Sequence, residues 1–130
     1  MSTRANIKVV DGYDELWFYR HSDGYPEGAM PTLEKFLDLV KSGKIRDNVV
    51  QACGHLIVLG RQEYLEQDLL RSEYMNWKVG AIEPTTEQHG DIEYFYTIDL
   101  VKKTITIEEE KPDYGRNVEE DYLRMEKEEY

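Results

Sequence analysis

The chain has 130 residues, a length that fits one domain with one modest core. Its net charge of -11 is unevenly distributed along the chain. Met1–Ile107 carries 12 basic and 17 acidic residues, whereas Glu108–Tyr130 carries four basic and ten acidic ones. Such a surface repels phosphates, which argues against direct nucleic-acid binding and favours a basic protein partner. No apolar run approaches the ~20 residues of a membrane helix. The single cysteine, Cys53, and a start without a signal-peptide pattern predict a cytoplasmic protein.

The N-terminal part of the chain predicts a β-hairpin. Ile7–Val10 and Leu16–His21 are rich in β-branched and aromatic residues, and a turn at Asp11-Gly12 separates them. In the second strand, alternation places Leu16 and Phe18 on one face and Trp17, Tyr19 and His21 on the other.

Two or three helices are expected next. Pro31 suits the first turn of a helix, and Gly43 suits its end. Asp47 is a candidate N-cap for a second helix, which is apolar almost all round and therefore predicted to be central and buried. Gly60 either breaks this helix, leaving residues 61–74 as a third one, or lies within it. The predicted helical core comprises Leu33, Phe36, Leu37, Val50, Leu56 and Ile57.

Three alternating segments, residues 75–82, 91–99 and 103–108, predict the remaining strands. The resulting order, ββ-helices-βββ, predicts an α+β domain over residues 1–107: a mostly antiparallel sheet of about five strands with two or three helices packed on it. Residues 108–130 form an acidic tail, which is either loosely attached or a docking helix with Val118, Tyr122 and Met125 on one face.

The chain resembles a family of small proteins encoded by bacteriophages, prophages and some bacteria, through the segments DELWFYRHSDGYPEG, IRDNVVQACGHLIVLG and WKVGAIEPTTEQHGDIEYFYTIDL. The resemblance covers roughly Asn6 to Ile107, and YRHSDGYP and HGDIEY are its specific parts. It implies an accessory protein acting inside an infected or lysogenic bacterium, a setting in which many such proteins bind host factors, often those of antiviral defence. It implies no catalytic residue.

Two H-x-D triplets, His21/Asp23 and His89/Asp91, are each placed at the edge of a predicted strand. Positions i and i+2 of an extended chain project to the same side, so each triplet can offer an imidazole nitrogen and a carboxylate oxygen together. If the two loops meet, the four side chains suit Zn, Mn or Fe and could support metal-dependent hydrolysis. The number of helices between the second and third predicted strands sets the direction of the third strand. With three helices the two loops are expected to meet, and with two helices they are expected to lie at opposite ends of the sheet.

A plainer interpretation competes with this one. Asp23-Gly24 is a strong turn dipeptide, and Tyr25-Pro26 sets an extended approach to the helix, so the segment can simply be a well-built turn. The same loop could also bind a small molecule or a protein. His55 is predicted to be a core histidine and Cys53 to be packed and inert.

The tyrosines admit two interpretations as well. Tyr94 and Tyr96 share one face of a predicted strand, with Trp17, Tyr19 and Trp77 as possible neighbours. Such rings either form the core face of the sheet, which is the interpretation we favour, or present an interface.

The leading functional hypothesis is a non-enzymatic interaction protein that inhibits a host defence component by binding it. The alternatives are a small metal-dependent hydrolase and a protein that binds a nucleotide signal through Arg20 or Arg46. The expected partner is a host protein, self-association is left open, and no cofactor is assigned. The candidate binding residues are Tyr19, His21, Asp23, Tyr25, Pro26, His89 and Asp91.

Overall fold

The computed structural model describes residues 3–66 and 81–110, and these form one sheet with two helices. The strands lie in the order β3-β2-β1-β4-β5. Their bounds are β1 Ala5–Val10, β2 Glu15–Arg20, β3 Glu83–Thr85, β4 Tyr94–Asp99 and β5 Thr104–Glu109, and those of the helices are α1 Pro26–Lys41 and α2 Val49–Glu66. Only the pairing of β1 with β4 is parallel among these strands. The predicted α+β fold with a mostly antiparallel sheet is thereby confirmed.

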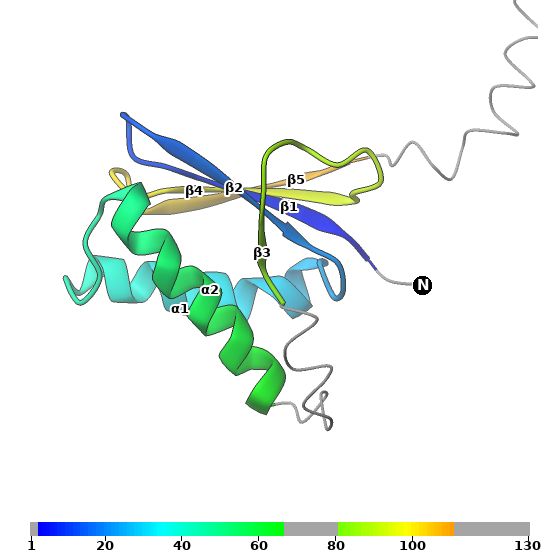
Figure 1. The fold of residues 1–130 in the computed structure, drawn as a ribbon, viewed down its shortest axis with the longest axis horizontal. Helices are drawn as coiled ribbons and strands as arrows, with labels where there is room; N and C mark the ends of the chain where they lie inside the picture. The colour runs from blue at the N-terminus through cyan, green and yellow to red at the C-terminus, as the bar shows by residue number, and fades with distance from the viewer. Residues whose placement is uncertain (1–2, 67–80, 111–130) are drawn as a thin grey trace, which may run out of the picture.

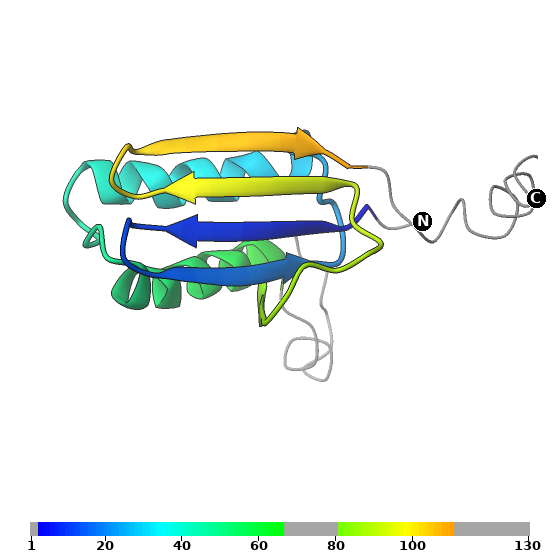
Figure 2. The ribbon, with the colours of Figure 1, turned by 90° about the horizontal axis from the view of Figure 1, so that it is seen from above.

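Both helices cover the same face of the sheet (Figures 1 and 2). Alternation along the strands directs one set of side chains toward them, including Ile7, Phe18 and Tyr96, which are all 2% exposed or less. Leu33 and Leu56 meet this set from the two helices and are completely buried. The other face of the sheet carries Trp17, Tyr19 and Phe95.

The first helix begins earlier than predicted. Pro26, not Pro31, occupies the start of α1, and Pro31 lies inside the helix. Tyr25 has the extended backbone expected before a proline, and its carbonyl oxygen accepts the N–H groups of Gly28 and Ala29, both at 2.9 Å, which closes the first turn. The predicted end is confirmed, because Gly43 follows the helix with a left-handed φ of 81°.

The second helix is capped from two directions. Asn48, rather than the predicted Asp47, accepts the Gln51 N–H at 3.1 Å, and Asp11 in the β1–β2 turn accepts the Val49 N–H at 2.8 Å. The N–H groups of Val49, Asp14 and Tyr13 lower the pKa of Asp11 from its ordinary value. The cap therefore ties the hairpin turn to the start of α2.

The prediction that α2 is buried all round was wrong. Leu56 is completely buried, but Val50 is 65% exposed and Ile57 is 37% exposed, because the sheet and α1 cover only one side of the helix among the described residues. Gly60 does not break α2. A Cβ atom at Gly60 would lie 3.1 Å from Ile82, so glycine allows the chain before β3 to approach the helix closely.

The third strand also differs from the prediction. β3 is a three-residue strand, Glu83–Thr85, in a segment expected to be a loop, whereas most of the expected strand at 75–82 lies outside the described residues. β5 reaches Glu109, so the start of the predicted tail belongs to the sheet, and residues 111–130 lie outside the described part. Within the described part, no helix is long and apolar enough to cross a membrane.

Replacing Leu56 with alanine should test which side of α2 is buried. We expect Leu56→Ala to lower the free energy of unfolding by about 2–5 kcal/mol, because it leaves a cavity in the core. Val50→Ala on the exposed side should change it by less than about 0.5 kcal/mol. Urea unfolding of both variants measures the difference, and equal losses would contradict the described placement of α2.

Candidate functional site

The loop after β2 is attached to the interior of the protein by Arg20. This side chain is 1% exposed and pairs with Glu63 of α2, which is 8% exposed. One guanidinium nitrogen donates to Glu63 Oε1 at 2.8 Å, and the other contacts Oε2. Thr32 of α1 donates to Glu63 Oε1 at 2.7 Å. A buried charge is tolerated when it is paired and hydrogen-bonded, and here both conditions are met.

The same buried side chains also bind the backbone of the loop. Arg20 Nε donates to the carbonyl oxygens of Ser22 at 2.8 Å and Asp23 at 3.1 Å. The buried Tyr96 hydroxyl donates to the Gly24 carbonyl oxygen at 2.5 Å. Burial raises the pKa of Tyr96 further above its ordinary value, so the hydroxyl keeps the proton that this bond requires. The loop conformation is therefore fixed from within the protein.

Two glycines let this loop fold tightly. A Cβ atom on Gly24 would lie 2.8 Å from the Thr3 carbonyl oxygen, and one on Gly28 would lie 2.5 Å from the Asp23 carbonyl oxygen. Asp23, which immediately precedes Gly24, adopts a left-handed φ of 55°. The interpretation of this segment as a well-built turn is thus supported by its geometry.

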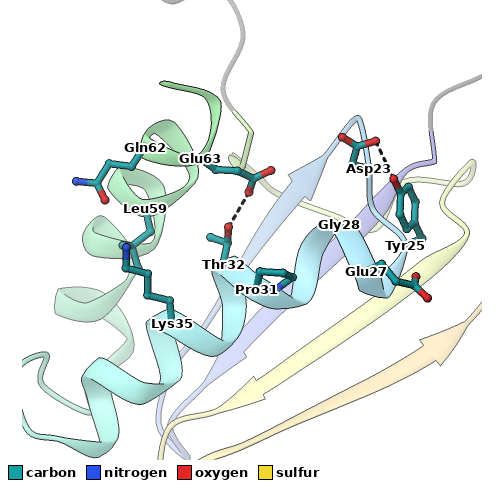
Figure 3. A pocket seen from close by; sticks show the side chains of 10 residues that line it. All are labelled: Asp23, Tyr25, Glu27, Gly28, Pro31, Thr32, Lys35, Leu59, Gln62 and Glu63. Atoms are coloured by element: carbon teal, nitrogen blue, oxygen red, sulfur yellow. Dashed lines mark hydrogen bonds between the residues drawn. The ribbon is translucent and has the colours of Figure 1, made fainter. Parts of the chain in front are cut away.

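The rigid loop borders a hollow of about 410 Å³ between α1 and α2, which we call the acidic hollow (Figure 3). Its carboxylates are Asp23, Glu27 and Glu63, and Lys35 is the basic side chain that lines it. Tyr25, which is 38% exposed, stands beside Asp23 and Glu27, and its hydroxyl lies 3.5 Å from Asp23 Oδ1. The volume lies within the range typical of small-ligand pockets.

The opposite face of the sheet holds a second group, the His–Tyr cluster, made of Arg4, Tyr19, His21, His89 and Asp91. The Tyr19 ring stacks on His89 with centroids 4.0 Å apart, and its hydroxyl lies 3.0 Å from His21 Nδ1. Arg4 bridges the two loops, because it donates to Asp91 Oδ2 at 2.8 Å and approaches His21 Nδ1 at 3.4 Å. Since arginine only donates, this contact places the proton of a neutral His21 on Nε2.

Local contacts fix the positions of Tyr19 and His89 in this cluster. The backbone N–H of His89 donates to the buried Asn6 Oδ1 at 2.8 Å. The ring Nε2 of His89 lies 3.1 Å from the Thr85 hydroxyl. Burial raises the pKa of Tyr19, and the nearby Asp91 carboxylate raises it further. The Tyr19 phenol therefore stays protonated at neutral pH.

The two H-x-D loops do meet, although the chain has only two helices among the described residues. β3 is so short that residues 86–93 return at once, across the face away from the helices, to the end of the sheet where β2 finishes (Figure 1). The predicted dependence on a third helix is not tested, because residues 67–80 lie outside the described part of the chain. The triplets nevertheless do not act as pairs. The left-handed Asp23 is directed to the acidic hollow, and Asp91 is bound to Arg4.

The predicted metal site is therefore not assembled. Among residues 3–66 and 81–110, no group of three or more histidine, cysteine, aspartate or glutamate side chains is arranged to hold a metal ion. The guanidinium of Arg4 already supplies a positive charge between His21 and Asp91.

The other residues considered in the sequence analysis are Cys53, His55 and Arg46. Cys53 is buried, and burial raises its pKa to about 12, with a further contribution from Asp11, so the thiol stays protonated as predicted for an inert cysteine. The core prediction for His55 was wrong, because this residue is exposed on α2. Arg46 lies in the α1–α2 connection, far along the molecule from Arg20, so these two arginines do not form a joint phosphate site.

The aromatic residues are divided between the two faces of the sheet. Tyr94 and Tyr96 lie toward the helices, with ring centroids 6.5 Å apart, and Tyr96 is part of the core, as the favoured interpretation predicted. For Trp17 and Tyr19 this interpretation was wrong, because both lie on the other face: Trp17 packs edge-on against Phe95 at 5.4 Å and Tyr19 stacks on His89. Trp77 lies outside the described residues.

The sequence analysis missed the buried Arg20–Glu63 pair, although a signal was present. Arg20 falls on the same strand face as Phe18, and Glu63 follows Leu56 and Leu59 along the buried side of α2. Two opposite charges at positions where the pattern requires burial must find partners, and these two find each other.

Gly28→Ala should show whether the tight loop is required. Since the new Cβ atom would collide with backbone at Asp23, we expect the free energy of unfolding to fall by about 1–3 kcal/mol. Gly54→Ala is the matched control, because Gly54 is an exposed helical glycine with no heavy atom within 4 Å of its Cβ position, and it should be neutral or stabilising by up to ~1 kcal/mol. Equal effects in thermal or urea unfolding would refute the described loop packing.

Comparisons with protein-family models, curated proteins and solved structures found no match. The resemblance to phage-encoded proteins thus stays a prediction from the quoted segments, and the functional argument depends on the geometry of the two groups described above.

Proposed function

We propose that this chain is a non-enzymatic interaction protein that binds a basic side chain of a protein partner in the acidic hollow. The observation that carries the proposal is the combination of Asp23, Tyr25 and Glu27 around a hollow whose backbone is fixed from within. Two carboxylates beside an aromatic ring are the groups that an arginine or lysine side chain prefers, through charge-assisted hydrogen bonds and a cation–π contact.

The charges of the hollow support a cationic occupant. Glu63 is neutralised by Arg20 and bonded to Thr32, which leaves Asp23 and Glu27 to face a partner. Among the described residues that line the hollow, Lys35 carries the opposing positive charge. The net charge of the described residues also favours a positively charged partner, since they carry ten basic and 18 acidic side chains. Such a surface speeds encounter with a positively charged protein.

Rigidity adds to the case for a contact surface. Arg20, Tyr96 and the close contacts of Gly24 and Gly28 order the loop before any partner arrives. A preordered loop loses little conformational entropy on binding, so more of the contact energy becomes affinity. Exposed Tyr25 and Glu27 are therefore suited to recognition.

The resemblance to phage-encoded proteins suggests the biological setting of this interaction. In a bacterium that carries the phage, a binding protein of this kind would act on a host protein, and a component of antiviral defence is the target class that we propose. Binding through the hollow would inhibit that component by occupying a basic contact residue that it needs for its own function.

Removing the negative charges of Asp23 and Glu27 should weaken partner binding. We expect Asp23→Asn/Glu27→Gln to slow association with the captured partner on the order of tenfold at low salt, with a smaller effect at high salt. The measurement is capture from a bacterial lysate followed by mass spectrometry, and then association kinetics with the purified partner.

Glu34→Gln/Asp38→Asn provides the control, because it removes the same charge from exposed positions of α1 that do not line the hollow. This control should retain the partner. If both double variants bind the captured protein equally, the hollow is not the contact site.

A further inference from the structure

The outer edge of β5 is a complete, unpaired strand edge within the described residues (Figure 2). Its six residues pair without interruption with β4, so no bulge disturbs it, and it contains no proline. The opposite edge, β3, is protected by its short length and by Pro84. β5 is therefore the edge that can accept another strand.

Hydrogen bonding to β4 determines which backbone groups of β5 face outward. Glu110 N–H donates to the Glu93 carbonyl oxygen at 2.7 Å. Because backbone direction alternates along an antiparallel ladder, Thr106 and Glu108 direct their N–H and C=O groups toward β4. Ile105, Ile107 and Glu109 then direct theirs to the free edge.

The charge order along this strand is complementary to itself when reversed. Lys102 and Lys103 precede it, whereas Glu108, Glu109 and Glu110 end it. A second copy aligned antiparallel therefore brings the lysines of each chain beside the glutamates of the other. Opposite charges in cross-strand positions stabilise a pairing, and like charges disfavour it.

Only one register satisfies both the backbone and the side chains. With Thr106 opposite Thr106 of a second copy, Ile105 lies opposite Ile107 and Lys103 opposite Glu109, so the outward backbone groups face each other. A shift of two residues in one direction keeps one Ile107–Ile107 pair but sets Ile105 opposite Glu109 twice, and a shift in the other direction keeps one Ile105–Ile105 pair but sets Ile107 opposite Lys103 twice. A shift of one residue sets residues whose backbone N–H and C=O groups point to the free edge opposite residues whose groups point to β4, so no hydrogen-bonded ladder forms.

We propose that two copies of this chain associate through antiparallel pairing of their β5 edges, in this register, to form a continuous ten-stranded sheet with two-fold symmetry. Ile107, which is 41% exposed, is covered by Ile105 of the second copy. Lys103 lies in the turn before β5 with a left-handed φ of 60°, and its Nζ donates to the Leu100 carbonyl oxygen at 2.7 Å and contacts Asp47 at 3.3 Å. The exposed ion pair with Asp47 is weak, so the incoming Glu109 can compete for this ammonium group.

Sedimentation equilibrium of the full chain over a wide concentration range tests the proposal. Wild-type protein should be dimeric at high concentration, whereas a monomer at every concentration would overturn the inference. Ile107→Pro removes an outward N–H and one isoleucine without breaking a bond to β4, so it should give a folded monomer with an unchanged far-ultraviolet circular dichroism spectrum.

Charge reversal tests the register without relying on that variant. Lys103→Glu and Glu109→Lys should each raise the dimer dissociation constant about tenfold, because each creates two like-charge pairs per dimer. The double variant Lys103→Glu/Glu109→Lys restores opposite charges and should recover dimerisation. Dimerisation unchanged in both single variants, or not recovered in the double variant, would contradict the proposed pairing.

Discussion

The buried ion pair between Arg20 and Glu63 is the interaction on which the loop and the acidic hollow depend. An unpaired charge in the interior is costly, so once Arg20 is buried at the end of β2, the folded chain requires Glu63 beside it. This requirement connects the end of β2, the early part of α1 through Thr32 and the late part of α2. The loop that presents Tyr25 is therefore positioned by the core, and its exposed side chains remain available for a partner.

Most of the fold follows from local patterns, because β1, β2, α1 and β4 each bury one face against a common core, and β5 adds the partly buried Ile105 to it. Two features could not be predicted in this way. β3 has three residues including Pro84, and a segment this short has no periodicity to read. α2 is apolar on two sides, yet Val50 is exposed, because hydrophobicity does not reveal how many layers will cover a helix.

The sequence singled out the two H-x-D loops but not the arrangement of their side chains. The triplet spacing assumed an extended chain, whereas the left-handed backbone of Asp23 separates it from His21 and directs it to the other side of the sheet. The bridge by Arg4 between His21 and Asp91 joins residues that are distant in sequence, so no local spacing could indicate it. Long-range pairing of charges, not motif spacing, determined which residues came together.

A double-mutant cycle on the buried pair tests this account most directly, with the free energy of unfolding in urea measured for Arg20→Met, Glu63→Leu and the double variant. Each single change leaves one charge buried without its partner, so each should cost about 3–5 kcal/mol, and the double variant should cost clearly less than their combined loss. That coupling would establish the pair as the constraint that sets the loop. Small and additive losses would contradict the account, because the loop would then keep its conformation without the pair.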